Sequence, residues 1–213
     1  MKKSKLNVVF FLLIFLSIGA FSRNFEGVLT YIKESGKDTT YVYWYIKNNK
    51  VRIEEYNRFK DIQSTILVDI NKESAFLISA EQKLYTPYEQ KNSSFGNMDN
   101  FKIIKSDNFK VINGIKCYQW RVRNISKNTE ISYWVARDSF MFFDKLVLHL
   151  DKTDNSISFF TSIPDYKGFF PVMSEERTLV RDAKSKVSLV SIKEKMVNNN
   201  LFVIPSDYKL LVL

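Results

Sequence analysis

Cysteine and histidine are almost absent from this chain of 213 residues, which contains one of each, Cys117 and His149. A single cysteine cannot form an internal disulfide, so the folded state must be stabilised by packing. A single histidine excludes the HExxH motif, three-histidine zinc sites and histidine-rich copper sites. We therefore expect no metal site in this protein.

The motifs of nucleotide binding and nucleophilic catalysis are also missing. The six glycines form neither a GxGxxG sequence nor a phosphate-binding loop, and no GxSxG sequence exposes a serine. His149 lies within an apolar helical pattern, and Cys117 has no neighbouring base to activate it. Adjacent acids such as Glu54 and Glu55 point to opposite faces of a strand and cannot flank one glycosidic bond. We expect no catalytic residues, no cofactor and no enzymatic activity; carboxylates that converge from distant positions are the remaining alternative.

One long apolar run is present, at the N-terminus. Three lysines within the first five residues precede an apolar segment over residues 8–16, and the small residues Ala20 and Ser22 follow. This order is typical of a secretory signal that is cleaved after Ser22. The alternative is a membrane anchor, which needs roughly 20 apolar residues, and polar residues interrupt this run before that length. The sequence therefore predicts a signal peptide over residues 1–22 and a single domain over residues 23–213.

Export has consequences for location and partners. No cysteine stands directly after the apolar run, so we expect a protein without a lipid anchor. After cleavage it should lie in the periplasm or at the cell surface and have no transmembrane span. The predicted signal holds three lysines and no acids, which leaves a net charge of +6 spread along the rest of the chain. An exported chain rarely meets nucleic acid, so this charge favours solubility and attraction to anionic membrane surfaces. We expect a monomer.

Alternating apolar residues and β-forming runs predict strands through most of the chain. A run from Tyr41 to Ile46, the turn Lys47-Asn48-Asn49-Lys50 and a second run from Val51 indicate a hairpin. Polar residues over 91–100 indicate a loop. The predicted strands cover residues 25–33, 40–47, 51–54, 65–70, 74–78, 83–86, 101–105, 116–123, 130–137, 170–180 and 186–195, before a tail over 202–208.

The alternation is broken over residues 138–150. Phe142, Phe143, Leu146 and Leu150 recur at helical spacing, and Asp138 stands where a capping residue would precede the helix. A second, shorter helix is predicted over residues 154–163, ended by Pro164. The predicted fold class is therefore mainly β (α+β), with a long antiparallel meander and one helical insertion.

Aromatic residues make up 15% of the chain. The three tryptophans, Trp44, Trp120 and Trp134, fall in three separate predicted strands, and the helical stripe adds Phe142, Phe143 and Leu146. These six residues either pack in an ordinary core or line an apolar cavity, because ligand pockets are largely apolar with few polar groups. They are the candidate ligand-lining residues.

The order of several short segments resembles the "domain of unknown function 4412" family of bacterial envelope proteins. The segments are Phe25-Glu26-Gly27, Tyr45 to Glu54, Leu67-Val68-Asp69, Lys83-Leu84-Tyr85, Asn113 to Cys117, Tyr133 to Ala136 and Phe202 to Tyr208. That family is similar in architecture to the LolA/LolB lipoprotein-carrier superfamily. The resemblance implies an antiparallel half-open barrel with one or two helices plugging its concave face, and it supplies no catalytic residues.

Two functions follow as expectations. The first is a non-enzymatic envelope protein that binds a lipid, a lipoprotein acyl chain or another lipophilic ligand in an apolar concavity. The second is an interaction or sensor module that uses the same fold to contact another envelope protein. An open cavity lined by aromatic residues favours the first, and a collapsed core with an exposed apolar patch favours the second.

Overall fold

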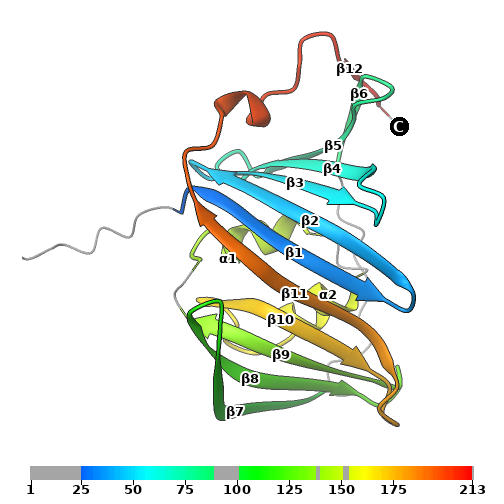
Figure 1. Ribbon diagram of the computed structural model, residues 1–213, viewed down its shortest axis with the longest axis vertical. Helices are drawn as coiled ribbons and strands as arrows, with labels where there is room; N and C mark the ends of the chain where they lie inside the picture. Colours follow the sequence, from blue (N-terminus) through cyan, green and yellow to red (C-terminus); the bar gives the residue numbers. More distant parts are fainter. Residues whose placement is uncertain (1–24, 89–100, 138–139, 151–153, 213) are drawn as a thin grey trace, which may run out of the picture.

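Twelve strands form one sheet in the computed structural model of the protein, in the order β12-β6-β5-β4-β3-β2-β1-β11-β10-β9-β8-β7 (Figure 1). The structure describes residues 25–88, 101–137, 140–150 and 154–212, so the predicted signal, the predicted loop over 91–100 and Asp138 lie outside the described residues. The strands are β1 Gly27–Ser35, β2 Asp38–Lys47, β3 Lys50–Tyr56, β4 Ile62–Asp69, β5 Ser74–Ser79, β6 Leu84–Pro87, β7 Phe101–Ile112, β8 Ile115–Asn124, β9 Thr129–Arg137, β10 Phe169–Arg177, β11 Ala183–Glu194 and β12 Lys209–Leu210.

Local sequence explains the strands and their turns. In β2, Val42, Trp44 and Ile46 are buried, and they alternate with tyrosines on the other face. Asn48 and Asn49, which join β2 to β3, both have positive φ angles of 48° and 61°. Asparagine tolerates this conformation, which matches the twist of a two-residue hairpin. The predicted hairpin is confirmed by the pairing of Lys47 with Lys50.

The two halves of the sheet are joined by strands from opposite ends of the chain. β1 pairs with β2 on one side and with β11 on the other, both antiparallel. β12 pairs with β6 in parallel. The prediction of a mainly β protein is therefore confirmed, as an open and mostly antiparallel sheet.

β7 exceeds its predicted length more than any other described strand, while β10 ends at Arg177, before the predicted residue 180. β7 extends to Ile112, although Ser106, Asp107 and Asn108 interrupt the apolar pattern after Lys105. A register shift between Lys105 and Phe109 accommodates these polar residues, and pairing with β8 then resumes.

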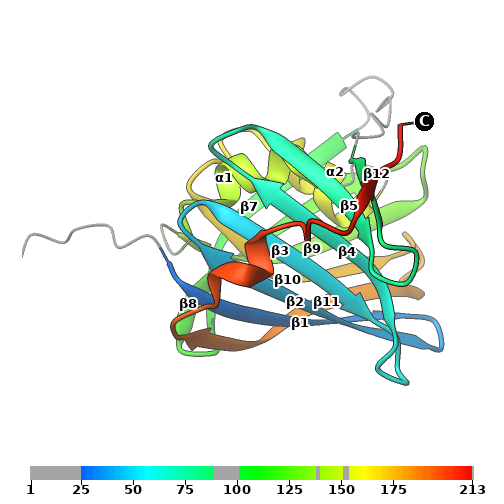
Figure 2. The same ribbon diagram turned by 90° about the horizontal axis from the view of Figure 1, so that it is seen from above.

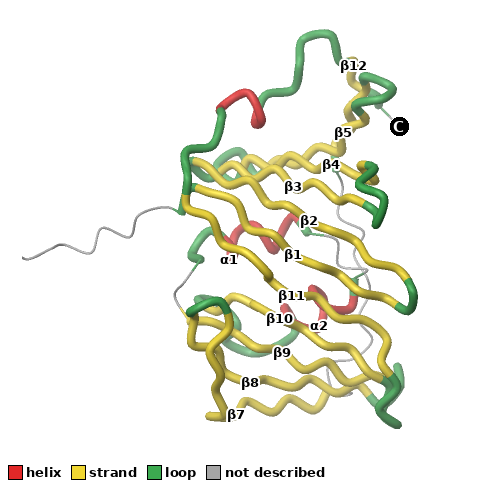
Figure 3. The backbone as a smooth tube through the Cα atoms, in the orientation of Figure 1, coloured by secondary structure: helices red, strands yellow, loops and turns green. Residues whose placement is uncertain are grey.

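Little of the chain is helical, as Figure 3 makes plain. The helical segments are α1 Phe143–Leu146, η2 Val147–His149, α2 Asn155–Thr161 and η3 Asn199–Phe202. α1 and α2 lie on the same face of the curved sheet (Figure 2), where Phe143 stacks on Trp44 and Phe160 stacks on Trp120. Among the described residues, no helix is long and apolar enough to cross a membrane.

The prediction of one continuous helix over residues 138–150 is wrong. The segment forms one turn of α-helix, α1, which tightens into the 3₁₀ turn η2 and stops at Leu150 in extended conformation. No side chain caps α1, so packing fixes this short segment. The predicted apolar stripe is nevertheless buried at Phe143, Leu146 and Leu150. The second predicted helix is confirmed as α2, with Asp154 as its capping residue.

Candidate functional site

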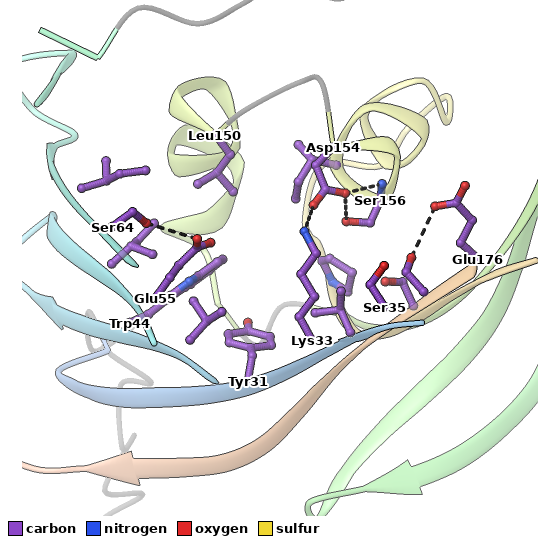
Figure 4. Close-up of a pocket in the computed structure, with 18 of the residues that line it drawn as sticks. Tyr31, Lys33, Ser35, Trp44, Glu55, Ser64, Leu150, Asp154, Ser156 and Glu176 are labelled. Carbon is purple, nitrogen blue, oxygen red and sulfur yellow. Dashed lines mark hydrogen bonds and ion pairs between the residues drawn. The ribbon is translucent and has the colours of Figure 1, made fainter. Parts of the chain in front are cut away.

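A cavity of about 620 Å³ lies between the helix-bearing face of the sheet and the helices (Figure 4). Side chains from the central strands form its floor, and Phe143 of α1, Leu150 and the first residues of α2 contribute to its roof. Its apolar lining includes Tyr31, Val42, Trp44, Ile53, Phe143 and Val187. Its polar lining includes Lys33, Glu55, Asp154, Glu176, Lys184 and Ser185.

Trp44 is the centre of the apolar part. Its ring lies 4.9 Å from that of Tyr31 and 6.3 Å from that of Phe143, measured between centroids. Phe170 packs edge-on against both Trp44 and Phe143. Offset and edge-to-face aromatic pairs stabilise such a cluster beyond the burial of area, so this wall of the cavity is held in a defined shape.

The exposure of side chains along β1 shows which end of the cavity is deep and which end opens to solvent. Leu29 and Tyr31 are buried, at 0% and 5% exposure, while Lys33 is partly buried and Ser35 is exposed. β3 repeats this gradient, because Val51 and Ile53 are buried but Glu55 is only partly so. The apolar part is therefore deep, and the polar part lies toward the end of the sheet where β1 turns into β2. We call this polar part the mouth.

An ion pair crosses the mouth. Nζ of Lys33 lies 2.6 Å from Oδ2 of Asp154, and Figure 4 shows Lys33 reaching up from β1 to the start of α2. The other oxygen of Asp154 accepts hydrogen bonds from the backbone N–H of Ser156 at 2.8 Å and from its hydroxyl at 2.7 Å. Asp154 thus caps α2 and fixes the helix to the sheet at once.

The electrostatics of this corner follow from these contacts. Burial opposes the charge of Asp154, but Lys33 and the donors of Ser156 outweigh it and lower the pKa of the carboxyl group. The hydroxyl of Tyr133 donates to the backbone oxygen of Ser156 at 2.8 Å. Burial, with Asp154 and Glu176 nearby, raises the pKa of Tyr133, so this phenol remains a hydrogen-bond donor at neutral pH.

Glu176 organises the facing side of the mouth. Its carboxylate accepts hydrogen bonds from the amide of Asn155 at 3.0 Å and from the hydroxyl of Ser185 at 3.3 Å. Nζ of Lys184 lies 3.6 Å from the same carboxylate. Across the cavity, the hydroxyl of Ser64 donates to Glu55 at 3.1 Å. The mouth therefore presents charges of both signs above an apolar interior.

This arrangement suits recognition of an amphiphilic molecule.

Among the described residues, no group of three or more histidine, cysteine, aspartate or glutamate side chains could hold a metal ion. Cys117 is fully buried, and it lies outside the lining together with His149. Small-molecule sites are commonly concave, with apolar walls and polar groups that orient the ligand; here the polar groups are numerous and lie at the mouth.

The six predicted ligand-lining residues occupy different environments. Trp44 and Phe143 line the cavity. Leu146 is fully buried in the core beside it, and Phe142 is partly buried and stacks on Phe25. Trp120 and Trp134 are not part of the lining.

Trp120 packs on the same face of the sheet but in the core. Its ring lies 4.5 Å from that of Phe169 and stacks on Phe160. Trp134 neighbours Tyr133 on β9 and therefore points to the other face, where Nζ of Lys110 lies 4.1 Å above its ring.

The polar residues of the mouth were not identified from the sequence. The sequence pattern could have placed Lys33 at the site, because side chains alternate along a strand and Lys33 therefore shares a face with Leu29 and Tyr31. The position of Asp154 could also have been predicted, since the sequence Asp154-Asn155-Ser156 resembles the start of a helix. Nothing in the sequence indicated that these two residues meet, 121 positions apart.

The fold and site define a class: an open antiparallel sheet with short helices on one face and an apolar cavity between them. The chain belongs to the family described as domain of unknown function DUF4412, whose model matches residues 25–208. No curated protein matches the sequence.

Several solved structures are similar to this chain. An uncharacterized conserved protein from Thermus thermophilus matches with a TM-score of 0.50 and 6% identity, over 89% of this chain and 93% of that one. MucB matches with a TM-score of 0.45 and 8% identity, over 85% of this chain and 58% of that one. A putative outer membrane lipoprotein-sorting protein domain from Vibrio parahaemolyticus matches with a TM-score of 0.32 and 6% identity, over 83% and 87%. At these identities the first likeness concerns the fold alone, and the other two are weaker.

Proposed function

We propose that this protein is a non-enzymatic binding protein of the cell envelope that holds the apolar part of a lipid, a lipoprotein acyl chain or a similar amphiphile. The observation that carries this proposal is the cavity of about 620 Å³ with its apolar interior and charged mouth. Its volume falls within the range of roughly 300–1,000 Å³ that is usual for small-molecule sites. An acyl chain inserted past Lys33 would contact Trp44 and Phe143, and its polar group would stay at the mouth.

On this proposal, the curved sheet acts as a half-open barrel and α1 and α2 act as its plug. The helices are short, and they pack on the sheet through aromatic contacts such as Trp44 with Phe143 and through the Lys33–Asp154 ion pair. Contacts of this kind can separate and re-form without breaking the ladder of the sheet. A small movement of the helices would widen the cavity for an entering chain.

A module that only contacts another protein would need no internal cavity. The lining by Trp44 and Phe143 therefore supports ligand binding over the interaction module, which remains the alternative function.

Export is part of the same proposal. The signal pattern over residues 1–22 supports cleavage after Ser22 and a mature protein that begins at Arg23. N-terminal sequencing of protein from an envelope fraction tests this proposal. An intact N-terminus at Met1 would overturn it.

A cavity-filling substitution tests the binding function. Val187 lines the cavity, while Val190 lies on the same strand outside the lining and is 42% exposed. We expect Val187→Phe to weaken binding of a fluorescent fatty-acid probe, because the larger ring occupies space that the chain needs. Val190→Phe is the matched control and should leave binding unchanged. Equal probe affinity in Val187→Phe, Val190→Phe and the unaltered protein would contradict the proposal.

A further inference from the structure

Four hairpin connections lie together at the end of the sheet where the cavity has its mouth (Figure 1). They are residues 36–37 between β1 and β2, 57–61 between β3 and β4, 125–128 between β8 and β9, and 178–182 between β10 and β11. The strand register places three of them side by side, because Ser35 pairs with both Asp38 and Ser185, and Arg177 pairs with both Glu130 and Ala183. The fourth, 57–61, follows the pairing of Tyr56 with Tyr41 at the same end. The backbone N–H of Leu179 also donates to the side chain of Asn128 at 3.2 Å. We call these four connections the tips.

Three of the tips expose a large apolar side chain. Phe59, Ile125 and Val180 are 69%, 72% and 76% exposed. They come from three different hairpins, so they are spread over this end of the molecule. The guanidinium group of Arg58 lies 4.6 Å above the ring of Phe59. Each apolar group thus stands beside a cation in its own tip, with Lys127 near Ile125 and Arg181 next to Val180.

The connections that form the tips carry a net positive charge. The tips carry five basic residues, Lys37, Arg58, Lys60, Lys127 and Arg181, and two acids, Asp61 and Asp182, which gives a net charge of +3. The connection between β5 and β6 at this end adds one acid and one lysine. At the opposite end, connections 48–49, 70–73 and 113–114 carry one lysine and one acid, and the strand ends beside them add Lys47, Lys50, Lys193 and Lys195 with Asp69 and Glu194.

The two acids of the tips are bonded within their own turns. Asp61 accepts a hydrogen bond from the amide of Asn57 at 3.0 Å. Asp182 lies 3.4 Å from the hydroxyl of Thr178. The five basic residues are exposed at the surface of the tips, and Nζ of Lys127 also lies 5.6 Å from the ring centroid of Phe159. This end therefore combines an excess of positive charge with protruding apolar groups.

We propose that the tips dock on an anionic lipid surface, with Phe59, Ile125 and Val180 entering the headgroup region and the basic residues contacting the headgroups. Amphiphilic surfaces of this kind bind at membrane interfaces through buried apolar area and electrostatic attraction. The mouth lies at the same end, where Lys33 and Ser35 precede the first tip. Docking in this orientation brings the mouth to the bilayer, where a lipid chain can pass between the two. The proposal deepens the proposed function and rests on it for the transfer step, while the docking itself is tested separately.

The experiment measures partition of the purified protein onto sedimented vesicles. One set contains phosphatidylcholine alone, and the other an equimolar mixture of phosphatidylcholine and phosphatidylglycerol. We expect strong preference for the anionic set, because each lysine or arginine near such a surface contributes about fivefold in affinity. The affinity of the double variant Lys37→Ser, Arg58→Ser for the anionic vesicles should therefore fall roughly twenty-fivefold. Phe59→Ser should also weaken binding to the anionic set.

Matched controls come from the opposite end. Lys72 and Lys195 are exposed there, so Lys72→Ser, Lys195→Ser removes the same charge from the whole molecule. Met196 is 89% exposed and gives the apolar control Met196→Ser. Partition should be unchanged for Met196→Ser and should fall only slightly for the lysine pair. Absence of vesicle binding, equal binding to both sets, or an equal loss in these controls would overturn the docking.

The fatty-acid probe separates the two proposals. If the protein in solution binds the probe but not the anionic vesicles, the docking fails and the proposed function stands. If it docks through the tips but binds no probe, the docking stands and the proposed function fails.

Discussion

Lys33 and Asp154 are joined by an ion pair of 2.6 Å between Nζ and Oδ2. This contact links the second half of β1 to the residue that begins α2, across 121 positions of sequence. It is also part of the cavity mouth. One side chain, Asp154, therefore serves helix capping, the attachment of helix to sheet and the polarity of the entrance.

Two substitutions separate the capping role of Asp154 from its ion pair. Asparagine caps helices as well as aspartate, whereas alanine does not. We expect Asp154→Ala to lower the free energy of unfolding by about 1–2 kcal/mol, the usual effect of losing a cap. Asp154→Asn should cost less than about 1 kcal/mol, because a partly exposed ion pair contributes little. Urea denaturation measures both, and equal costs would show that the cap contributes nothing.

The ion pair also predicts a dependence on pH. The folded state lowers the pKa of Asp154 below its ordinary value of 3.8, so the folded state favours the charged form. The resulting stability is fully present above that ordinary value and is lost as the pH falls through the lower, folded pKa. The stability advantage of the unaltered protein over Asp154→Asn should be constant near neutral pH and shrink in acid. An advantage that grows in acid would contradict this assignment.

Within α1, truncation of the Phe143 side chain should lower the free energy of unfolding most. It is 1% exposed and contacts Trp44, Phe160 and Phe170. We expect Phe143→Ala to lower the free energy of unfolding by about 3–5 kcal/mol, because a large buried side chain leaves a void. Leu148 belongs to the adjoining turn η2 and is 50% exposed, so Leu148→Ala should cost no more than about 0.5 kcal/mol. A cost below about 1 kcal/mol for Phe143→Ala would mean that this segment is peripheral to the core.

The sequence contained enough information to locate the strands but not their partners. Alternation in segments such as Val42 to Ile46 depends only on neighbouring residues, so it is visible locally. The pairing of Gly27 with Glu194 brings together opposite ends of the chain, and no local pattern encodes such a contact. The same limit applies to the site, where Trp44 and Phe143 were identified by residue type but Lys33 and Asp154 were not.

The error over residues 138–150 has a related cause. Helical spacing of Phe143, Leu146 and Leu150 reports which side chains face the core, and these three are indeed buried. Spacing alone does not report whether the backbone stays α-helical between them. In the structure the chain tightens into η2 and then extends at Leu150, which keeps the same residues inward in a much shorter element.

Cys117 should be unreactive in the folded protein. It is fully buried, its thiol lies 3.4 Å from the backbone oxygen of Ile115, and burial raises its pKa. The thiolate is the reactive form, so alkylation by iodoacetamide should be on the order of a hundredfold slower in buffer than in urea. Mass spectrometry of the alkylated protein measures this ratio. Similar rates of alkylation in buffer and in urea would contradict the burial of Cys117.

The most direct test of ligand binding is displacement of a fluorescent fatty-acid probe by fatty acids of increasing chain length, at low and high salt and without vesicles. Each buried methylene contributes about 0.8 kcal/mol, or about fourfold in affinity. If the apolar interior holds the chain, affinity should rise steeply with length until the cavity is filled and should respond only weakly to salt. Binding through surface charge alone would ignore chain length and weaken as the Debye length shortens to about 8 Å at physiological salt. That second pattern, or no probe binding at all, would contradict the proposed function.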